Sequence, residues 1–382
     1  MASSTSTDRI VSPVDWVALA RELGPALADR APALDANDTF PFDNFRELKE
    51  RRVLSAGIST ELGGGGASYA ELCAVLRELG RHCGATALAL SMHIHLVAAM
   101  VWLWRQGAPV APLLEQIAAE QLVLVTSGAS DWLVSGGTAE RVDGGYRVTA
   151  RKTFGSGSPV GDLFITSAVY DDPVDGRTVL DFSVPLRAEG VTVMDNWRTM
   201  AMRASGSNDI MLDGVFVPEG AVTSRRPQGA WVPFLNVVTA VALPVVMSVY
   251  LGVAEAARDL ALQQVAKKRD DPTVWYLVGE MENALTAGRL AVQRAIDLNA
   301  EYTFAPDLTT SNALFICKTL AAEALRQTVE KALEVVGGGG IFRSMGLERL
   351  VRDIHAAQFH PLQAKRQHRF TGRMALGLDP TG

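Results

Sequence analysis

The spacing of apolar residues changes twice along this chain, and these two changes constrain its fold more than any other feature. Over residues 14–120, apolar residues recur three and four positions apart, which predicts α-helices. From about 121 to 228 the pattern becomes alternating or falls into short apolar runs between turn residues, which predicts β-strands. From 229 to about 336 the helical spacing returns over long segments, which predicts antiparallel helices of a bundle.

The chain is therefore expected to have an α+β fold with three domains. These are an N-terminal α-helical domain at 1–120, a middle β domain (a barrel or sandwich) at 121–228, and a C-terminal four-helix bundle at 229–382. Within the β domain, the Asp-Gly-Gly sequence at 143–145 predicts a hairpin. In the first domain, Asp43 and Ser68 are expected to cap the helices that follow them.

One segment, 237–254, is long and apolar enough to raise the question of a membrane span. Pro244 and Tyr250 interrupt it, however, and an ordinary amphipathic helix continues from its end. We therefore expect a helix buried in the bundle and no membrane partner.

Composition and charge exclude several other classes of protein. The net charge of −6, without any basic run, disfavours nucleic acid as a partner. The three cysteines lack metal-ligand spacing, so we expect no metal site, three buried thiols and a reducing cytoplasm. The N-terminus lacks the features of a secretory signal. Neither a dinucleotide-binding glycine motif after a strand nor a phosphate-binding loop is present, so no nicotinamide or nucleoside triphosphate site is expected.

The segment 332–361 carries the densest set of unusual residues. Four glycines, Gly337, Gly338, Gly339 and Gly340, end a helix, and Arg352-Asp353 then leads to His360-Pro361. A run of glycines lets backbone N–H groups approach a large anionic or planar ligand that any Cβ atom would hold away.

This order (a helix, GG-x-G, a short turn with an aromatic residue, then L-E-R-x-x-R-D) resembles the C-terminal domain of the acyl-CoA dehydrogenase superfamily. The sequence of helices, β domain and bundle also matches that family over almost the whole chain. The resemblance implies a flavoprotein in which residues 337–340 contact the cofactor, with FAD favoured over FMN. It also implies a homodimer or homotetramer with flavin sites at subunit contacts.

Two stretches of the β domain resemble the family's flavin-binding strands. In VTSGASDW at 125–132, Thr126 matches the family threonine, Ser127 replaces its glutamate, and Ser130 matches its serine, which implies contacts with the flavin pyrimidine edge. In ARKTFGSG, Phe154 matches an aromatic position and Ser156 falls on the residue that hydrogen-bonds flavin N5. The alternatives are a polar turn leaving a strand and a Ser-Gly turn at the surface.

The usual base of the family is missing. The two positions at which its members carry a catalytic carboxylate are Pro361 and Ala242 here, and neither side chain can accept a proton. His360 instead has the spacing of the catalytic histidine in the dibenzothiophene-type monooxygenases, and an imidazole exchanges protons near neutral pH. His93 and His95, two positions apart on a predicted helix, face different sides, and either is a candidate partner of His360.

Arg203 matches a family position near the mouth of the active site, where it would contact substrate or fix its own loop. The family's Arg-x-x-Phe-Gly motif, which holds the adenine and diphosphate of FAD, is absent. The equivalent stretch offers Lys267, Lys268 and Arg269 for a diphosphate, which leaves FMN, or a flavin delivered by a separate flavin reductase, as an alternative.

These observations favour a flavin-dependent oxidoreductase that uses reduced flavin and O₂ to monooxygenate a small organic substrate. Ser156 would contact the flavin and His360 would replace the usual glutamate. One alternative is an FAD-dependent dehydrogenase that desaturates acyl-CoA or acyl-carrier-protein substrates. Another is a catalytically silent homologue that binds flavin or a partner structurally.

Overall fold

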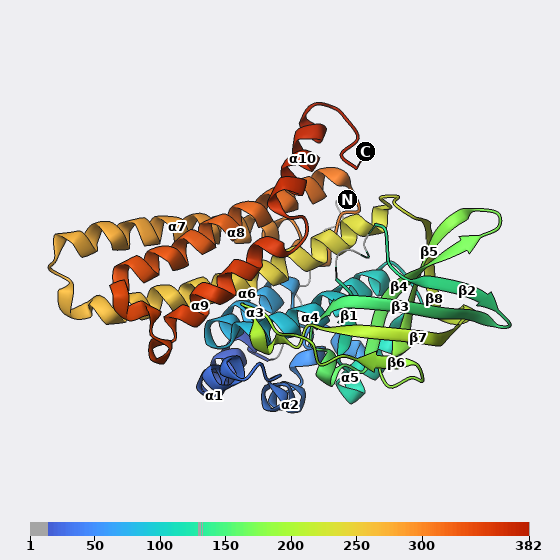
Figure 1. The fold of residues 1–382 in the computed structure, drawn as a ribbon, viewed down its shortest axis with the longest axis horizontal. Coiled ribbons are helices and arrows are strands. Elements are labelled where there is room, and N and C mark those ends of the chain that lie inside the picture. Colours follow the sequence, from blue (N-terminus) through green and yellow to red (C-terminus); the bar gives the residue numbers. More distant parts are fainter. Residues whose placement is uncertain (1–13, 129–130, 132, 382) are drawn as a thin grey trace, which may run out of the picture.

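The computed structural model describes residues 14–128, 131 and 133–381, and it has the expected mixed architecture (Figure 1). The helices are α1 (Trp16–Ala36), α2 (Phe42–Glu50), α3 (Tyr69–His82), α4 (Gly84–Arg105), α5 (Ala111–Glu120), α6 (Pro233–Val265), α7 (Pro272–Asp297), α8 (Leu308–Val336), α9 (Leu347–Ile354) and α10 (Ala364–Ala375). The strands are β1 (Leu124–Thr126), β2 (Thr138–Val142), β3 (Gly145–Gly155), β4 (Leu163–Asp172), β5 (Gly176–Pro185), β6 (Val191–Val193), β7 (Asn208–Pro218) and β8 (Val222–Pro227). The sheet lies at one end of the molecule, and α7 and α8 extend toward the other.

The starts of α3 and α2 test the two predicted caps. At α3 the Ser68 hydroxyl accepts from the Glu71 amide at 3.2 Å, and the Ser68 amide donates to the Glu71 carboxylate at 2.8 Å, which forms a capping box. The prediction for Asp43 is wrong. Pro41 occupies the cap position of α2, and Asp43 lies in the first turn, where a negative charge still favours the helix dipole.

Among the described residues, eight strands form one sheet in the order β6-β7-β3-β2-β4-β5-β8, with β1 paired to β4. The Asp-Gly-Gly turn joins β2 to β3 as predicted: Val142 pairs with Gly145, and Gly144 has a φ of +76°, which favours glycine. β1 runs parallel to β4 and β2 also pairs with it in parallel, whereas the other pairs are antiparallel. β3 therefore runs antiparallel to β1, and the loop after β1 passes beside the last residues of β3, where the Gly128 amide donates to the Thr153 carbonyl.

Helix α6 connects the two ends of the molecule and packs directly on α3. A Cβ atom added to Gly252 would lie 2.1 Å from the Arg77 carbonyl oxygen, and one added to Gly80 would lie 2.5 Å from that of Val249. The two backbones therefore approach closely because both contacts are made at glycines. The Tyr69 hydroxyl adds a hydrogen bond to the Val241 carbonyl at 2.8 Å. This contact fixes the N-terminal helices against the bundle.

Two helical segments, Gly84–Arg105 and Pro233–Lys268, are long and apolar enough to cross a membrane by composition alone. In the structure, 72% and 94% of their most apolar windows are buried by other parts of the chain. This burial accounts for their apolar character, because a helix that is hydrophobic all round belongs in a protein core or in lipid. The predicted buried helix at 237–254 lies within the second segment.

Candidate functional site

The end of β3 presents an exposed aromatic ring beside a buried hydroxyl. Phe154 has a φ of +61°, which is unusual for a bulky residue, and its side chain is 58% exposed. Its ring meets Trp197 edge-on, with the centroids 5.9 Å apart. Ser156 is buried, and its Oγ lies 2.8 Å from the Oγ of Ser207, which in turn lies 2.7 Å from that of Ser205. The strained backbone holds a ring at the surface that packing alone would bury, as functional sites often do.

The loop after β1 lies directly against this position. The Gly128 amide donates to the Thr153 carbonyl at 2.9 Å, which brings Ser127 and Thr126 next to Phe154. The Ser127 hydroxyl is 3.1 Å from that of Thr166, and the Thr126 hydroxyl makes only a long contact of 3.4 Å with the Ser127 carbonyl. The structure thus brings together four of the residues predicted to bind flavin. Ser130, a fifth, lies outside the described residues.

Lys152 fixes this loop by hydrogen bonds from its side chain. Its buried ammonium donates to the Asp131 carboxylate at 2.9 Å and to the Gly136 carbonyl at 2.8 Å. The second carboxylate oxygen of Asp131 is buried without a hydrogen-bond partner among the described residues. A buried acceptor of this kind needs a donor from outside the described chain, and a polar ligand would supply one.

His360 is held by residues from two helices. Its Nε2 atom lies 2.8 Å from the hydroxyl of Tyr250 in α6. The buried Lys318 of α8 donates to the carbonyls of Gln358 and Leu362, both at 3.2 Å, on either side of His360. Burial, together with the Lys318 charge, lowers the pKa of His360 to about 3, so the imidazole is neutral at physiological pH.

His93 and His95 have different surroundings on α4. The Nε2 atom of His93 is 2.8 Å from the Leu54 carbonyl, and its Nδ1 atom accepts from the Leu124 amide at 3.1 Å. Both ring nitrogens are therefore bound to backbone groups, and the bond to Leu124 connects α4 to β1. Among the described residues His95 uses one ring nitrogen, Nδ1, which lies 3.2 Å from the Ser91 carbonyl one helical turn earlier. Burial lowers the pKa of each histidine to about 4.

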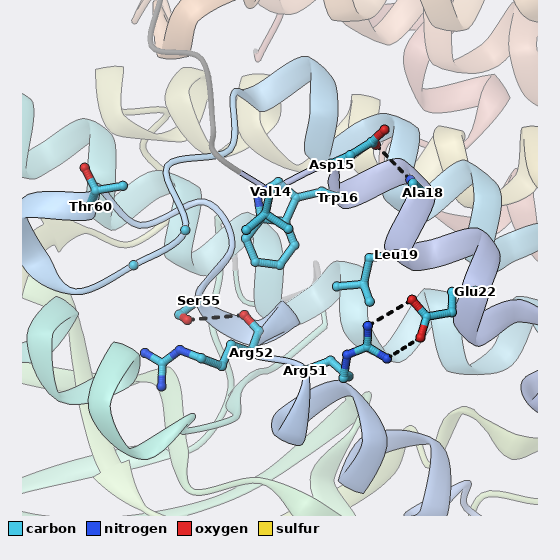
Figure 2. Close-up of a pocket in the computed structure, with 12 residues that line it drawn as sticks. Val14, Asp15, Trp16, Ala18, Leu19, Glu22, Arg51, Arg52, Ser55 and Thr60 are labelled. Carbon is cyan, nitrogen blue, oxygen red and sulfur yellow. Dashed lines mark hydrogen bonds and ion pairs between the residues drawn. The ribbon is translucent and has the colours of Figure 1, made fainter.

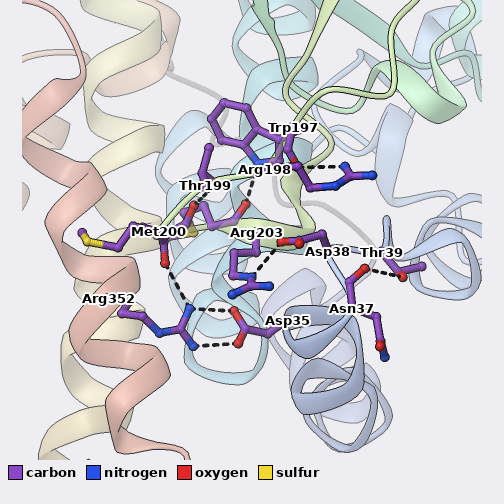
Figure 3. Close-up of polar contacts among 12 residues, drawn as sticks. Asp35, Asn37, Asp38, Thr39, Trp197, Arg198, Thr199, Met200, Arg203 and Arg352 are labelled. Carbon is purple, nitrogen blue, oxygen red and sulfur yellow. Dashed lines mark hydrogen bonds and ion pairs between the residues drawn. The ribbon is translucent and has the colours of Figure 1, made fainter.

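Arg203 belongs to a cluster of ion pairs that joins three parts of the chain (Figure 3). Its guanidinium donates to Asp38 at 2.7 Å, and Arg352 of α9 binds Asp35 at 2.6 Å and the Met200 carbonyl at 3.0 Å. These contacts fix the loop that carries Ser205 and Ser207. Contact between Arg203 and substrate stays a prediction.

The same loop links Ser156 to the region of His360. The Met202 amide donates to the Asp353 carboxylate at 2.6 Å, seven positions before His360. Burial raises the pKa of Asp353 to about 6. Burial, and then the Asp353 charge, raise the pKa of Tyr250 well above its usual range. A continuous set of hydrogen bonds therefore runs from Ser207 through Ser205 and Met202 to Asp353, whose charge acts on Tyr250.

The two positions of the family's carboxylate remain without an acid. Ala242 is buried in α6, and Pro361 follows His360. Glu255, farther along α6, is bound by Arg77 at 2.8 Å and by Arg289 at 2.7 Å. Burial alone would raise its pKa, but these arginine hydrogen bonds outweigh that effect and lower it. A carboxylate held ionised by two guanidinium groups is a poor base.

The glycine run lies far from this site within one chain. Figure 1 places the end of α8 at the end of the bundle away from the sheet. There Gly339 lines a hollow of about 510 Å³ with Gln263 and Gln264 of α6, just before Lys267 and Lys268. A Cβ atom at Gly338 would meet nothing within 4 Å, and one at Gly339 would meet only Met345 at 3.5 Å. Packing within the chain therefore does not explain these two glycines, and a group from outside it would.

A second hollow of about 510 Å³ lies against α1 and contains none of the predicted site residues (Figure 2). Trp16, Leu19 and Thr60 line it. Arg51 forms a two-pronged ion pair with Glu22 at 2.7 and 3.0 Å, and Arg52 donates to the carbonyls of Gly63 and Ala118. Because its guanidinium groups already have partners, this hollow offers little for recognition of a ligand.

Sequence reasoning missed Tyr250 and Lys318. Each carries a signal that could have identified it, because a tyrosine hydroxyl and a lysine interrupt helical faces that are otherwise apolar. Lys and Tyr on a buried face need specific partners. Their shared partner, the His360 segment, depends on how three helices align and is not encoded locally.

Comparison with known proteins gives the family. The model for the acyl-CoA dehydrogenase N-terminal domain matches residues 19–119, and that for the C-terminal domain matches residues 245–364. The amino sugar nitrososynthase DnmZ of Streptomyces peucetius is 30% identical over 92% of this chain and 91% of its own length.

Two solved structures share the fold over nearly their whole length. A nitrososynthase from Micromonospora carbonacea var. africana has a TM-score of 0.88 at 25% identity, covering 97% of this chain and 99% of its own. KijD3, in complex with FMN and dTDP-3-amino-2,3,6-trideoxy-4-keto-3-methyl-D-glucose, has a TM-score of 0.85 at 27% identity, covering 97% and 96%. The chain therefore belongs to the acyl-CoA dehydrogenase superfamily and is a flavin-dependent oxidoreductase.

Proposed function

We propose that this protein is a monooxygenase that uses reduced flavin and O₂ to oxygenate a small organic substrate. The observation that carries the proposal is the replacement of the family's base. Neither Ala242 nor Pro361 can accept a proton, and the ionisable group next to Pro361 in sequence is His360, held by Tyr250. Removal of a proton from an acyl α-carbon needs a positioned base, which contributes roughly 10²–10⁴ to the rate. Oxygen transfer does not need that base.

The end of β3 fits the ring of a flavin. Phe154 offers an exposed aromatic face and Ser156 a hydroxyl, while Thr126 and Ser127 lie on the adjoining loop. A bound reduced flavin would supply electrons to O₂. In this arrangement Ser156 would hydrogen-bond the ring, and His360 would hold a proton near the reacting oxygen. Closure of the site by α4 and the 197–207 loop would exclude water.

The flavin is either FMN or FAD, and we now favour FMN. The sequence resemblance favours FAD, but the FAD-binding Arg-x-x-Phe-Gly motif is missing and KijD3 carries FMN. The ring, the ribityl chain and the first phosphate are common to both, so the roles proposed for Ser156 and Phe154 do not depend on this choice. Release of the bound flavin and its identification by chromatography decide between them.

We further propose a homodimer or homotetramer in which the glycine run serves the flavin of a neighbouring copy. The support is the position of the end of α8, which lies away from the sheet in Figure 1, together with the open space around a Cβ atom built at Gly338. A Gly338→Val substitution should leave folding intact but weaken flavin binding. Gly279→Ala, at another open glycine on α7, is the matched control and should leave flavin binding unchanged.

The substrate class to test first is an amine on a nucleotide-linked sugar. The support is the similarity to DnmZ and to KijD3, whose structure contains such a compound. A separate flavin reductase would deliver the reduced flavin. The three buried, unpaired cysteines support a reducing compartment such as the cytoplasm.

The decisive experiment titrates reduced FMN and FAD into the protein without oxygen, then mixes the complex with air-saturated buffer. We expect tight binding of reduced flavin and, without substrate, release of hydrogen peroxide. Bleaching of the oxidised flavin by an acyl-CoA would instead support the desaturase. No affinity for flavin in either redox state would support the silent homologue. Ser156→Ala should weaken flavin binding, whereas Ser224→Ala on the edge strand β8 should not.

A further inference from the structure

The hydrogen bond between His360 and Tyr250 fixes more than the position of the imidazole. Tyr250 is fully buried, and burial keeps its hydroxyl protonated because the pKa lies well above the usual range. This hydroxyl has one hydrogen-bond partner among the described residues, His360 Nε2 at 2.8 Å. A buried hydroxyl needs an acceptor for its proton, and leaving it without one destabilises the folded protein.

Counting donors and acceptors then selects one tautomer. If Nε2 carried the histidine proton, it would donate to the Tyr250 oxygen and leave the tyrosine proton with no acceptor. If Tyr250 donates, Nε2 must be the acceptor, and the single proton of a neutral imidazole lies on Nδ1. Nδ1 has no partner in the part of the chain that the structure describes, so its N–H is available to a ligand.

Lys318 also acts on His360, through the backbone of the segment that carries it. Its side chain is 2% exposed and has no carboxylate partner among the described residues. Its two hydrogen bonds go to the carbonyls that flank His360, so the ammonium fixes the backbone of this turn. A positive charge so close also opposes protonation of the imidazole. Asp353 of α9 is a further ionisable group whose charge acts on Tyr250, and it accepts a hydrogen bond from the Met202 amide.

We propose that Tyr250 and Lys318 are positioning residues that hold His360 as a neutral imidazole with its proton on Nδ1. The Nδ1–H group of His360 then donates a hydrogen bond to the substrate, and His360 does not act as a base. This inference rests on the proposed function and deepens it. The family's carboxylate is a proton acceptor, whereas an N–H group stabilises negative charge that develops on oxygen. The change of polarity at this one position separates oxygen chemistry from desaturation.

The test is nitrogen-15 NMR of the histidine side chains in the full-length protein, without flavin or substrate. The chain has six histidines, and a His360→Gln variant assigns the signals of His360. In the wild type at pH 7 we expect a protonated Nδ1 and an unprotonated Nε2. A protonated Nε2, or a doubly protonated ring, would overturn the proposal. Because the measurement needs no cofactor, its outcome is independent of whether the oxygenase proposal holds.

Two variants separate the roles of the positioning residues. Tyr250→Phe should shift the His360 signals toward a mixture of tautomers, and unchanged signals would rule out a role for Tyr250. The matched control is Tyr69→Phe, which removes another fully buried hydroxyl that contacts α6 but should leave the His360 signals unchanged. Lys318→Gln should raise the pH at which His360 takes up a second proton. A titration identical to that of the wild type would overturn the role of Lys318, and the wild-type spectrum decides the tautomer even if a variant does not fold.

Discussion

His93 on α4 is fully buried and His360 after α9 is partly buried; both are neutral, yet the chain uses them differently. His93 has both ring nitrogens bound to backbone groups, Leu54 and Leu124. His360 has one nitrogen bound to Tyr250, and its other nitrogen has no partner within the described residues. Burial lowers the pKa of both, so the direction of the pKa shift does not distinguish them. The number of occupied ring nitrogens does, because an open nitrogen is what a substrate can use.

The largest effect should come from His360. We expect His360→Ala to lower turnover by roughly 10²–10⁴, the usual contribution of a positioned proton-handling group. The free energy of unfolding should fall by about 1 kcal/mol, because the Tyr250 hydroxyl loses its acceptor. Steady-state kinetics with reduced flavin and O₂, beside urea unfolding, measures both. His368→Ala, on the exposed face of α10, is the control and should behave as the wild type in both assays.

His93→Ala should reverse this pattern. The substitution leaves the Leu124 amide and the Leu54 carbonyl without partners in the core and opens a cavity there. We expect a loss of about 3 kcal/mol in the free energy of unfolding. Urea unfolding measures it directly. A loss below about 1 kcal/mol would contradict the assignment of His93 to structure.

The pH dependence of stability follows from the same histidines. Burial depresses the pKa of His93 and His95 to about 4 and helps to depress that of His360 to about 3, while the unfolded chain has its ordinary value near 6.5. Between these values the unfolded state binds more protons than the folded state. The contribution to stability is therefore complete above pH 6.5 and is lost as the pH falls through about 4, at up to about 1.4 kcal/mol per pH unit for each histidine.

Chemical unfolding measured from pH 7 to pH 4 checks this expectation. His360→Gln should reduce the slope of the unfolding free energy against pH by the contribution of one titrating histidine, which is at most about 1.4 kcal/mol per pH unit. Asp353 acts in the opposite direction, because burial raises its pKa to about 6 and its contribution is lost as the pH rises from about 4 to 6. Stability that stays flat from pH 6.5 to pH 4 in both wild type and Asp353→Asn would show that these histidines are not held neutral.

The smallest effect is expected for His95→Gln. His95 makes one described hydrogen bond, at 3.2 Å and within its own helix, so its loss should cost less than about 1 kcal/mol. The variant sharpens the comparison because His95 also has an open nitrogen. If turnover falls more than tenfold while stability is kept, His95 joins His360 in the site. If turnover is unchanged, an open nitrogen does not by itself identify a functional histidine.

The sequence predicted what depends on local pattern. The change from helix to strand and back, the hairpin at 143–145 and the cap at Ser68 follow from spacing and turn chemistry over a few residues. The cap at Asp43 was mispredicted because Phe40 packs on Phe42 and Phe45, and this aromatic cluster places the start of α2 at Pro41.

The candidate site was predictable only in part, because some of its residues are close in sequence and others meet only through long-range packing. Phe154 and Ser156 lie two positions apart on one strand, so a motif could identify them together. Tyr250 and His360 are separated by 110 residues, and their contact depends on the alignment of α6 with the segment after α9. The glycine run was found from composition, but no local pattern says at which end of a bundle the end of a helix will lie.

The most direct test of the account supplies the protein with reduced FMN, oxygen-18-labelled O₂ and a nucleotide-linked amino sugar, and analyses the product by mass spectrometry. We expect an oxygenated product that carries label from O₂, and loss of that product in His360→Ala. An acyl thioester desaturated without O₂, or product formation that is unchanged in His360→Ala, would contradict it.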